Sequence, residues 1–447
     1  MTDQPTPHRF GGISPAEALG LLREHAFLTV GCTDPIAIAL AAAHAARAGQ
    51  GNPLSIRVRL DKNVYKDALE VGIPGTSSRG LPLAAALGAL KGDPKKGLAL
   101  LEDVTPEQVL QAEAFLARSS VTLELDPWAE GIFVHATVLT DRGEGEAVLK
   151  GGHDRLEEVR RNGELLFCRA EGEEEGAPRR CPLALLEDAS MGDLKELAEA
   201  LPPEATRFLL EGVSLNRRAA EVGLRRGSGL GLGKRLESLA AKGFLEDDDL
   251  RGRIRRLTAG AADARMGGEQ VPIFGCFGSG NHGITLFLTL GLAAEAWGSS
   301  PDDLARALAL GLLVVGSIKA QTGILTPHCG CAVAAGCGAA AGLVLLRRGT
   351  AKQAERAVLL LFADLAGMLC DGAKYGCALK ISTSAGVALE SALLALEGAA
   401  LPPGNGLVGK DFRETLRNLR EVTEKGMKDL DRSLLEILLR RETSPCP

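Results

Sequence analysis

The chain has few aromatic residues and no long run of charges of one sign. Of its 447 residues only 4% are aromatic, and 51 basic against 57 acidic side chains leave a formal net charge of −6. Proteins whose main partner is nucleic acid or an anionic membrane need concentrated positive charge, so this balance argues against both. Hydrophobic residues make up 45% of the chain, which predicts a globular protein rather than a disordered one.

The sequence also lacks a recognisable signal peptide and an unbroken membrane-spanning run. Its N-terminal stretch has no basic start followed by an apolar segment. The most apolar region, residues 284–318, is interrupted by four charged side chains, which is typical of buried helices. We therefore expect a cytoplasmic protein, in which ten cysteines are reduced thiols rather than disulfides.

Hydrophobic patterning predicts a mixed α+β fold that is predominantly helical. Residues 14–30 and 35–48 are expected to be helices around the motif GCTDP, and residues 54–65 alternate as a half-buried strand does. From residue 269 onward, apolar helical runs alternate with short loops rich in Cys, His, Lys and Asn. The expected parts are the N-terminal portion of a helical catalytic domain (1–100), an inserted α+β domain (101–185), a helical connecting segment (186–260) and a C-terminal helical catalytic domain with its chemistry in interhelix loops (261–447).

Cysteines are concentrated in this last part, where six of the ten lie between residues 276 and 377. Their spacings, C-G-C, C-x5-C and C-x6-C, do not match the paired C-x2–4-C knuckles of structural zinc sites. Cys337 lies in an Ala/Gly run, where a thiol packs as a small hydrophobe. Cys370 and Cys377 instead lie among Gly, Lys and Asp residues. Iron–sulfur clusters take thiolates from loops of this kind.

Five motifs taken together resemble the L-cysteine desulfidase family, a serine dehydratase alpha-chain-like group. They are GCTDPIAIALAAA, LDKNVYK, GSGNHG, HCGCAVAAG and MLCDGAKYGCALK, and they are spread over nearly the whole chain. The resemblance implies a [4Fe–4S] cluster with three cysteine ligands, and a substrate at the fourth iron. Cys370 and Cys377 match the close pair of ligands, although their C-x6-C spacing departs from the longer spacing of iron–sulfur serine dehydratases. Cys329, with Cys331 as the alternative, matches the upstream ligand.

Cys32 of GCTDP precedes a predicted helix. The positive end of a helix dipole lowers the pKa of a thiol, so Cys32 is expected to act as a catalytic group or as a further ligand. Cys446, directly before the last residue, is expected to lie in a free tail.

Two glycine-containing loops, PGTSSRG and GSGNHG, are candidates for binding an amino-acid carboxylate. Glycine lets the backbone approach a ligand closely. Neither a G-x-x-x-x-G-K-[ST] loop nor an early G-x-G-x-x-G motif is present, which argues against a nucleotide. An ordinary helix cap is the alternative role for the residues of GSGNHG. The expected substrate contacts are Lys62, Asn63, Ser77, Ser78, Ser279, Asn281 and Lys380.

β-Elimination also needs a base with a pKa near neutrality, and a lysine in apolar surroundings reaches that range. Lys319 and Lys374 are favoured among five candidates that include Lys66, and His282 is an alternative base. Lysines also raise the possibility of pyridoxal phosphate, but the sequence has no accompanying phosphate loop and that cofactor leaves the cysteines unexplained.

The expected function is the iron–sulfur-dependent β-elimination of L-cysteine to pyruvate, ammonium and sulfide, with the substrate thiolate on the open iron of the cluster. L-Serine dehydration by the same chemistry is one alternative, and a non-enzymatic iron–sulfur or thiol redox sensor is another. The expected partner is a small amino acid, with no nucleic acid and no membrane, and we expect a homodimer.

Overall fold

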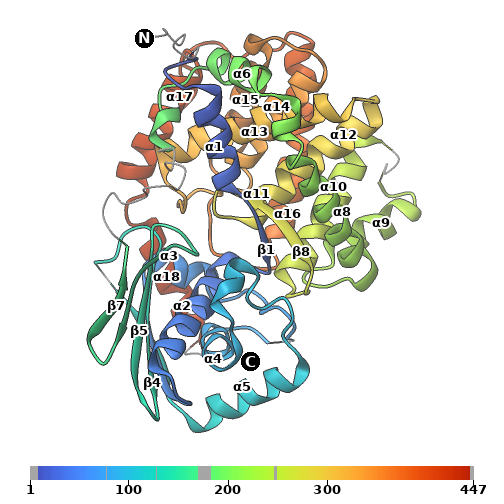
Figure 1. Cartoon of the computed structure of the whole chain (residues 1–447). Helices are drawn as coiled ribbons and strands as arrows, with labels where there is room; N and C mark the ends of the chain where they lie inside the picture. Colours follow the sequence, from blue (N-terminus) through green and yellow to red (C-terminus); the bar gives the residue numbers. More distant parts are fainter. Residues whose placement is uncertain (1–8, 77, 127, 170–182, 246–248, 443–447) are drawn as a thin grey trace, which may run out of the picture.

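The computed structural model describes residues 9–76, 78–126, 128–169, 183–245 and 249–442. Within these ranges the protein is a predominantly helical α+β fold, as the sequence predicts. Figure 1 shows a helical lobe and a smaller lobe built around a β-sheet. Ser77, Cys181 and Cys446 lie outside the described residues.

The smaller lobe is organised by a six-stranded sheet with the order β3-β2-β4-β5-β6-β7. The strand β2 runs parallel to β3 and antiparallel to β4, so that Val58 is aligned with both Leu123 and Ala136. The strands are β2 (Pro53–Leu60), β3 (Val121–Leu125), β4 (Phe133–Thr140), β5 (Gly143–Lys150), β6 (Leu156–Arg161) and β7 (Glu164–Cys168). Because β2 lies between β3 and β4, residues 101–185 do not form this sheet alone. The proposed domain boundaries stay a prediction.

A buried helix, α2 (Thr33–Gly49), packs between this sheet and α4 (Leu81–Lys91). Almost every residue of α2 is buried, as the Ala-rich sequence of a helix that is apolar on all sides requires. A Cβ atom at Gly88 would lie 2.0 Å from the carbonyl oxygen of Ala39, so glycine at this position lets the two helices approach closely. The helix α2 is thereby fixed, and its first residues point toward the other lobe. The remaining helical elements of this lobe are α3 (Lys62–Ala68), η1 (Pro94–Ala99) and α5 (Pro106–Arg118).

The helical lobe is built on α13 (Pro301–Thr322), which packs against α14 (Ala334–Leu346), and on α10 (Leu250–Met266), which packs against α8 and α16. Its other elements are α1 (Pro15–His25), η2 (Leu183–Leu186), α6 (Met191–Ala200), α7 (Pro203–Thr206), α8 (Leu209–Arg226), α9 (Leu232–Ala241), α11 (Gly280–Gly283), η3 (Ile284–Leu288), α12 (Thr289–Trp297), α15 (Ala351–Leu365), α16 (Cys377–Leu396), α17 (Phe412–Glu421) and η4 (Val422–Gly426). The last helix, α18 (Leu430–Glu442), returns to pack on α3 of the smaller lobe.

A two-stranded ribbon between the lobes corrects one expectation. Residues 26–30 were expected to belong to a helix, but α1 ends at His25 and β1 (Ala26–Val30) pairs antiparallel with β8 (Pro272–Cys276). The segment AFLTV contains aromatic and β-branched residues, which favour a strand once a partner strand is available. The chain then leaves β1 through Gly31 and enters α2 at the boundary of the two lobes.

One helix in the described ranges, α16, is long and apolar enough to span a membrane by length and composition. Of its most apolar window, 56% is buried. It packs against α10, α14 and α15, as a core helix of a globular protein does. The cytoplasmic location stays a prediction.

Candidate active site

A cavity lies where the two lobes meet. The smaller lobe contributes Cys32, Asp34 and Asp67 to its wall. The helical lobe contributes the end of α10, the loop between β8 and α11, the end of α13 with the loop that follows it, and the loop before α16 with the first turn of that helix. Ten residues that the sequence singled out line it together, namely Cys32, Ser279, Asn281, His282, Lys319, Cys329, Cys331, Cys370, Cys377 and Lys380. Residues that are up to 348 positions apart in the chain, Cys32 and Lys380, therefore belong to one site.

Backbone hydrogen bonds join the two loops that carry the C-terminal thiols. The amide of Cys329 donates to the carbonyl of Met368 at 2.7 Å, and the amide of Cys370 donates to the carbonyl of Pro327 at 2.8 Å. These bonds form an antiparallel bridge between the loop after α13 and the loop before α16. Local backbone pairing thus brings together cysteines that are 41 residues apart.

Four thiols of the C-terminal part lie on the cavity wall, those of Cys329, Cys331, Cys370 and Cys377. Burial and mutual contact determine their protonation. A hydrogen bond from Cys331 stabilises the thiolate of Cys329 and lowers its pKa to about 6, whereas the pKa of Cys331, the donor, rises far above its usual range. Burial raises the pKa values of Cys370 and Cys377. The contact therefore favours a thiolate at Cys329, and a bound cation would favour deprotonation of the other thiols.

The thiols on the cavity wall are of the kind that an iron–sulfur cluster binds. No group of three His, Cys, Asp or Glu side chains that could hold one metal ion is found in the described ranges. Four soft thiols around one desolvated cavity match the donors that iron–sulfur clusters use.

The thiol of Cys32 behaves differently from what its helix position predicts. It is the N-cap residue of α2, and its Sγ donates to Asp34 Oδ2 at 3.5 Å. Burial raises its pKa, and the nearby Arg265 charge offsets this only in part, so the expectation of a lowered pKa is wrong. Asp34 also accepts a hydrogen bond from His153 Nε2 at 3.1 Å, and both side chains are buried. Cys32 is therefore a protonated thiol on the wall of the cavity.

His282 and Lys319 form the basic part of the cavity. The Nδ1 atom of His282 donates to the carbonyl of Cys276 at 3.1 Å, since a carbonyl can only accept, and Nε2 therefore carries the lone pair. Burial and the Lys319 charge hold the pKa of His282 well below its usual value. Burial also lowers the pKa of Lys319, whose Nζ donates to the carbonyl of Ile324 at 2.9 Å. A Cβ atom at Gly330 would lie 2.6 Å from both His282 Nε2 and Lys319 Nζ, so this glycine keeps the two nitrogens accessible.

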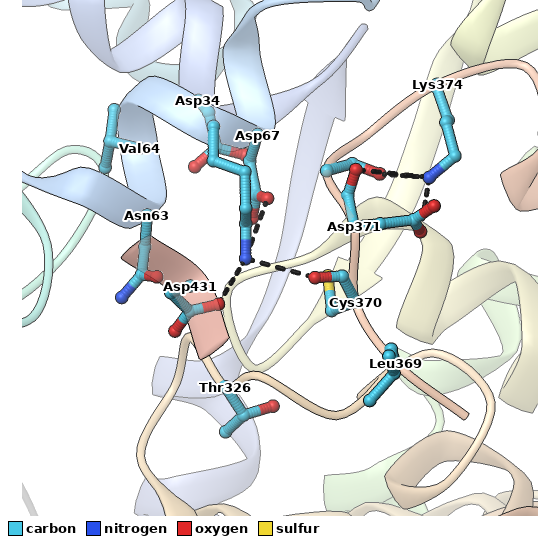
Figure 2. A network of polar contacts seen from close by, with 12 residues as sticks. Asp34, Asn63, Val64, Asp67, Thr326, Leu369, Cys370, Asp371, Lys374 and Asp431 are labelled. Carbon is cyan, nitrogen blue, oxygen red and sulfur yellow. Dashed lines mark hydrogen bonds and ion pairs between the residues drawn. The ribbon is translucent and has the colours of Figure 1, made fainter. Parts of the chain in front are cut away.

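A buried cation holds the Cys370 loop from the side of the smaller lobe (Figure 2). The Nζ atom of Lys66 lies 2.7 Å from Asp431 Oδ1, 3.2 Å from the carbonyl oxygen of Cys370 and 3.8 Å from Asp67 Oδ1. These three partners are labelled in Figure 2. Burial alone would lower the pKa of Lys66, but these acceptors outweigh it and the pKa is raised. Lys66 is therefore a structural cation rather than a base. Sequence reasoning missed its partner Asp431, which lies in an amphipathic terminal helix that resembles a surface helix.

Some expected site residues lie away from the cavity wall. Lys374 Nζ is held by the carbonyls of Asp371 and Gly372 at 3.2 and 3.3 Å and by the Asp371 carboxylate. Lys62, Asn63 and Ser78 are described but are not among the residues that form the wall.

Sequence reasoning also missed Arg265, which lines the cavity and is only 1% exposed. Its helix, α10, begins with a charged segment, LRGRIRRL, that suggests a surface helix. A usable signal was present nevertheless. The arginine follows the small-residue run TAGAADA, which is buried along its whole length.

Desolvated titratable groups around a cavity between two lobes are typical of an enzyme active site. A family model described as serine dehydratase alpha chain matches residues 95–436, so the chain belongs to the serine dehydratase alpha-chain family. Membership indicates a lyase of the serine dehydratase type. This confirms the coarser part of the resemblance seen in the sequence.

Curated relatives match over almost their full length. A UPF0597 protein of Nitratidesulfovibrio vulgaris (strain Miyazaki F) is 43% identical over 430 residues, which cover 92% of this chain and 96% of that protein. UPF0597 proteins of Clostridioides difficile (strain 630) and Caldanaerobacter subterraneus are 36% and 33% identical, over 92% and 94% of this chain and 96% and 98% of theirs. These names state no activity.

Proposed function

We propose that the protein is an iron–sulfur-dependent lyase that converts L-cysteine to pyruvate, ammonium and sulfide, with L-serine as the alternative substrate. The observation that carries the proposal is the convergence of five cysteine thiols, a neutral imidazole and a buried amine on one cavity. The serine dehydratase family supports the elimination chemistry, and the thiol donors support the cluster. Cys370, Cys377 and Cys329 are the proposed ligands, and Cys331 is the alternative to Cys329.

The reaction removes the Cα proton and breaks the Cβ–S bond, and the electron pair of the C–H bond becomes the new C=C bond. The resulting aminoacrylate tautomerises to an imine, which one water molecule hydrolyses to pyruvate and ammonium. When bound, the cluster supplies a Lewis-acidic iron that stabilises the departing sulfur. A desolvated cavity strengthens every electrostatic contact with the substrate.

His282 is the proposed base for the Cα proton. Its Nδ1 atom is occupied by the Cys276 carbonyl, so the lone pair on Nε2 faces Gly330 and the cavity. A lowered pKa keeps this nitrogen unprotonated at neutral pH, and the carboxylate of a bound substrate would raise the pKa toward the range that a general base needs. Lys319 lies beside it and supplies the positive charge that stabilises the carbanion-like electron density next to the carboxylate.

The test is anaerobic reconstitution of the full chain with iron and sulfide, followed by assays of pyruvate and sulfide from L-cysteine and L-serine. Visible iron–sulfur absorption together with turnover supports the proposal, and normal turnover after exhaustive iron removal would contradict it. Absorption without turnover of either amino acid would favour the redox sensor.

Cysteine variants sharpen this test. Cys370→Ala and Cys377→Ala should lose bound iron, sulfide and turnover together. Cys337→Ala is the matched control, because Cys337 is a buried thiol within α14 and is not part of the cavity wall. A full cluster in either of the first two variants would show that the altered cysteine is not a ligand.

A further inference from the structure

The guanidinium group of Arg265 is buried and incompletely paired. Its Nε atom donates to the carbonyl of Gly31 at 3.0 Å, while Nη2 is buried and has no hydrogen-bond partner in the described part of the chain. Arginine stays charged in proteins, so it cannot relieve this situation by losing a proton. A buried charged donor without an acceptor is unfavourable, and proteins normally provide a partner. Since Arg265 lines the cavity, an anion bound there can be that partner.

A second unpaired atom belongs to another residue of the same cavity wall and has the opposite polarity. Asn281 Nδ2 donates to the sulfur of Met266 at 3.6 Å, which leaves Asn281 Oδ1 as a buried acceptor without a partner among the described residues. Asn281 follows Gly280, whose backbone lies directly against the guanidinium. A Cβ atom at Gly280 would stand 2.4 Å from Arg265 Nε. The cavity wall therefore presents a free cationic donor beside a free acceptor.

We propose that Arg265 binds the α-carboxylate of the substrate and that the amide oxygen of Asn281 accepts a hydrogen bond from its α-ammonium group. This inference rests on the proposed function and deepens it, because it makes the free zwitterion of an α-amino acid the recognised class of substrate. The buried Nη2 group offers charged N–H donors to a carboxylate from the fixed plane of the guanidinium, which the flexible ammonium group of a lysine does not reproduce. Thiols and amines without a carboxylate should be excluded, since they leave the guanidinium unpaired.

The arrangement also orients the substrate relative to the base. His282 immediately follows Asn281, so the residue that holds the ammonium group and the residue that removes the Cα proton occupy adjacent positions of α11. Both the carboxylate and the ammonium group are attached to Cα. Anchoring the two of them beside His282 restricts the direction in which the Cα–H bond can point.

The experiment measures binding rather than turnover. L-Alanine carries both charged groups but no leaving group, and ethylamine lacks the carboxylate. Calorimetric titration of the reconstituted full chain should show binding of L-alanine and none of ethylamine. Arg265→Met should weaken L-alanine binding by about 10- to 100-fold, because a charged hydrogen bond is lost. Arg265→Lys should fall between the wild type and Arg265→Met.

Two further variants control for structural damage. Arg251→Met removes an exposed arginine of α10, the helix of Arg265, that pairs with Glu390 of α16, and it should bind L-alanine like the wild type. Gly280→Ala leaves the arginine in place but displaces its guanidinium group, and it should weaken binding to a similar extent as Arg265→Met. Circular dichroism shows whether each variant is folded, and Gly280→Ala decides the question if Arg265→Met does not fold.

The outcomes separate this inference from the proposed function. L-Alanine affinity that is unchanged in both Arg265→Met and Gly280→Ala overturns the inference, as does a wild type that binds L-alanine no better than ethylamine. If the wild type binds L-alanine through Arg265 but forms no pyruvate from L-cysteine or L-serine, the proposed reaction fails and the binding site stands.

Discussion

Two buried cations near the interlobe cavity differ in how completely the protein supplies their hydrogen-bond acceptors. Lys66, behind the Cys370 loop, is surrounded by acceptors from α3, α18 and that loop. Arg265, on the other side, keeps one protein acceptor at Nε and leaves Nη2 unpaired in the described ranges. A buried charge whose partners all come from the protein holds segments together. A buried charge with a missing partner is arranged for a ligand.

The comparison predicts that groups facing the cavity govern chemistry, and His282 offers the largest expected effect. His282→Gln keeps a side-chain donor for the Cys276 carbonyl but removes the basic nitrogen. We expect kcat to fall by about 100- to 10,000-fold, the usual contribution of a general base, with a much smaller change in KM. Steady-state pyruvate formation measures both. A variant with nearly wild-type kcat would exclude His282 as the base and leave Lys319 as the candidate.

Lys66, whose acceptors all come from the protein, should govern stability instead. Lys66→Met leaves Asp67 and Asp431 as buried carboxylates without their cation, and we expect a loss of about 3–5 kcal/mol in the free energy of unfolding. Urea denaturation of the apo protein measures it. The matched control is Lys425→Met, which breaks an exposed pair with Glu421. A loss from Lys66→Met as small as that of the control would remove the distinction between the two sides.

The protonation state of His282 should appear as a pH dependence of stability. Its folded-state pKa is depressed, so the unfolded chain takes up a proton below about pH 6.5 that the folded protein refuses. The stability contributed by neutral His282 is therefore present above that pH and is lost as the pH falls, by at most about 1.4 kcal/mol per pH unit. Denaturation of wild type and His282→Gln at pH 5, 6 and 7 gives the difference in slope. Equal slopes would contradict the depressed pKa.

The smallest expected effect on the free energy of unfolding is that of the control variant, Lys425→Met. Lys425 and Glu421 form an i,i+4 pair at 2.9 Å with 74% and 64% of their side chains exposed. Lys425→Met should change the free energy of unfolding far less than Lys66→Met does, because solvent and salt screen such pairs. Raising the salt concentration should reduce this difference further, and a cost near that of Lys66→Met would show that burial is not what separates the two ion pairs.

Much of the site could be predicted because its chemistry is local in the sequence. Cysteines with polar and glycine neighbours, and a buried lysine after an apolar run, were recognisable without a fold. Arg265 and Asp431 could not be found this way, because each lies in a helix with a charged face, and only packing shows which charge is buried. The pKa of Cys32 was misjudged for a related reason. The helix-start rule assumes an accessible thiol, and burial of Cys32 against Val71 and Met266 reverses the outcome.

The sequence by itself determined the predominantly helical α+β class, the reactive residue types and the loops that carry them, because periodicity and composition are local properties. Tertiary structure decided which of these residues meet. The bridge between the two cysteine loops, the return of α18 onto α3 and the close contact of Gly280 with Arg265 all join segments that are far apart in the chain. Packing also decided which charges are paired by the protein and which are free for a ligand, since desolvation depends on every neighbouring segment and not on the residue alone.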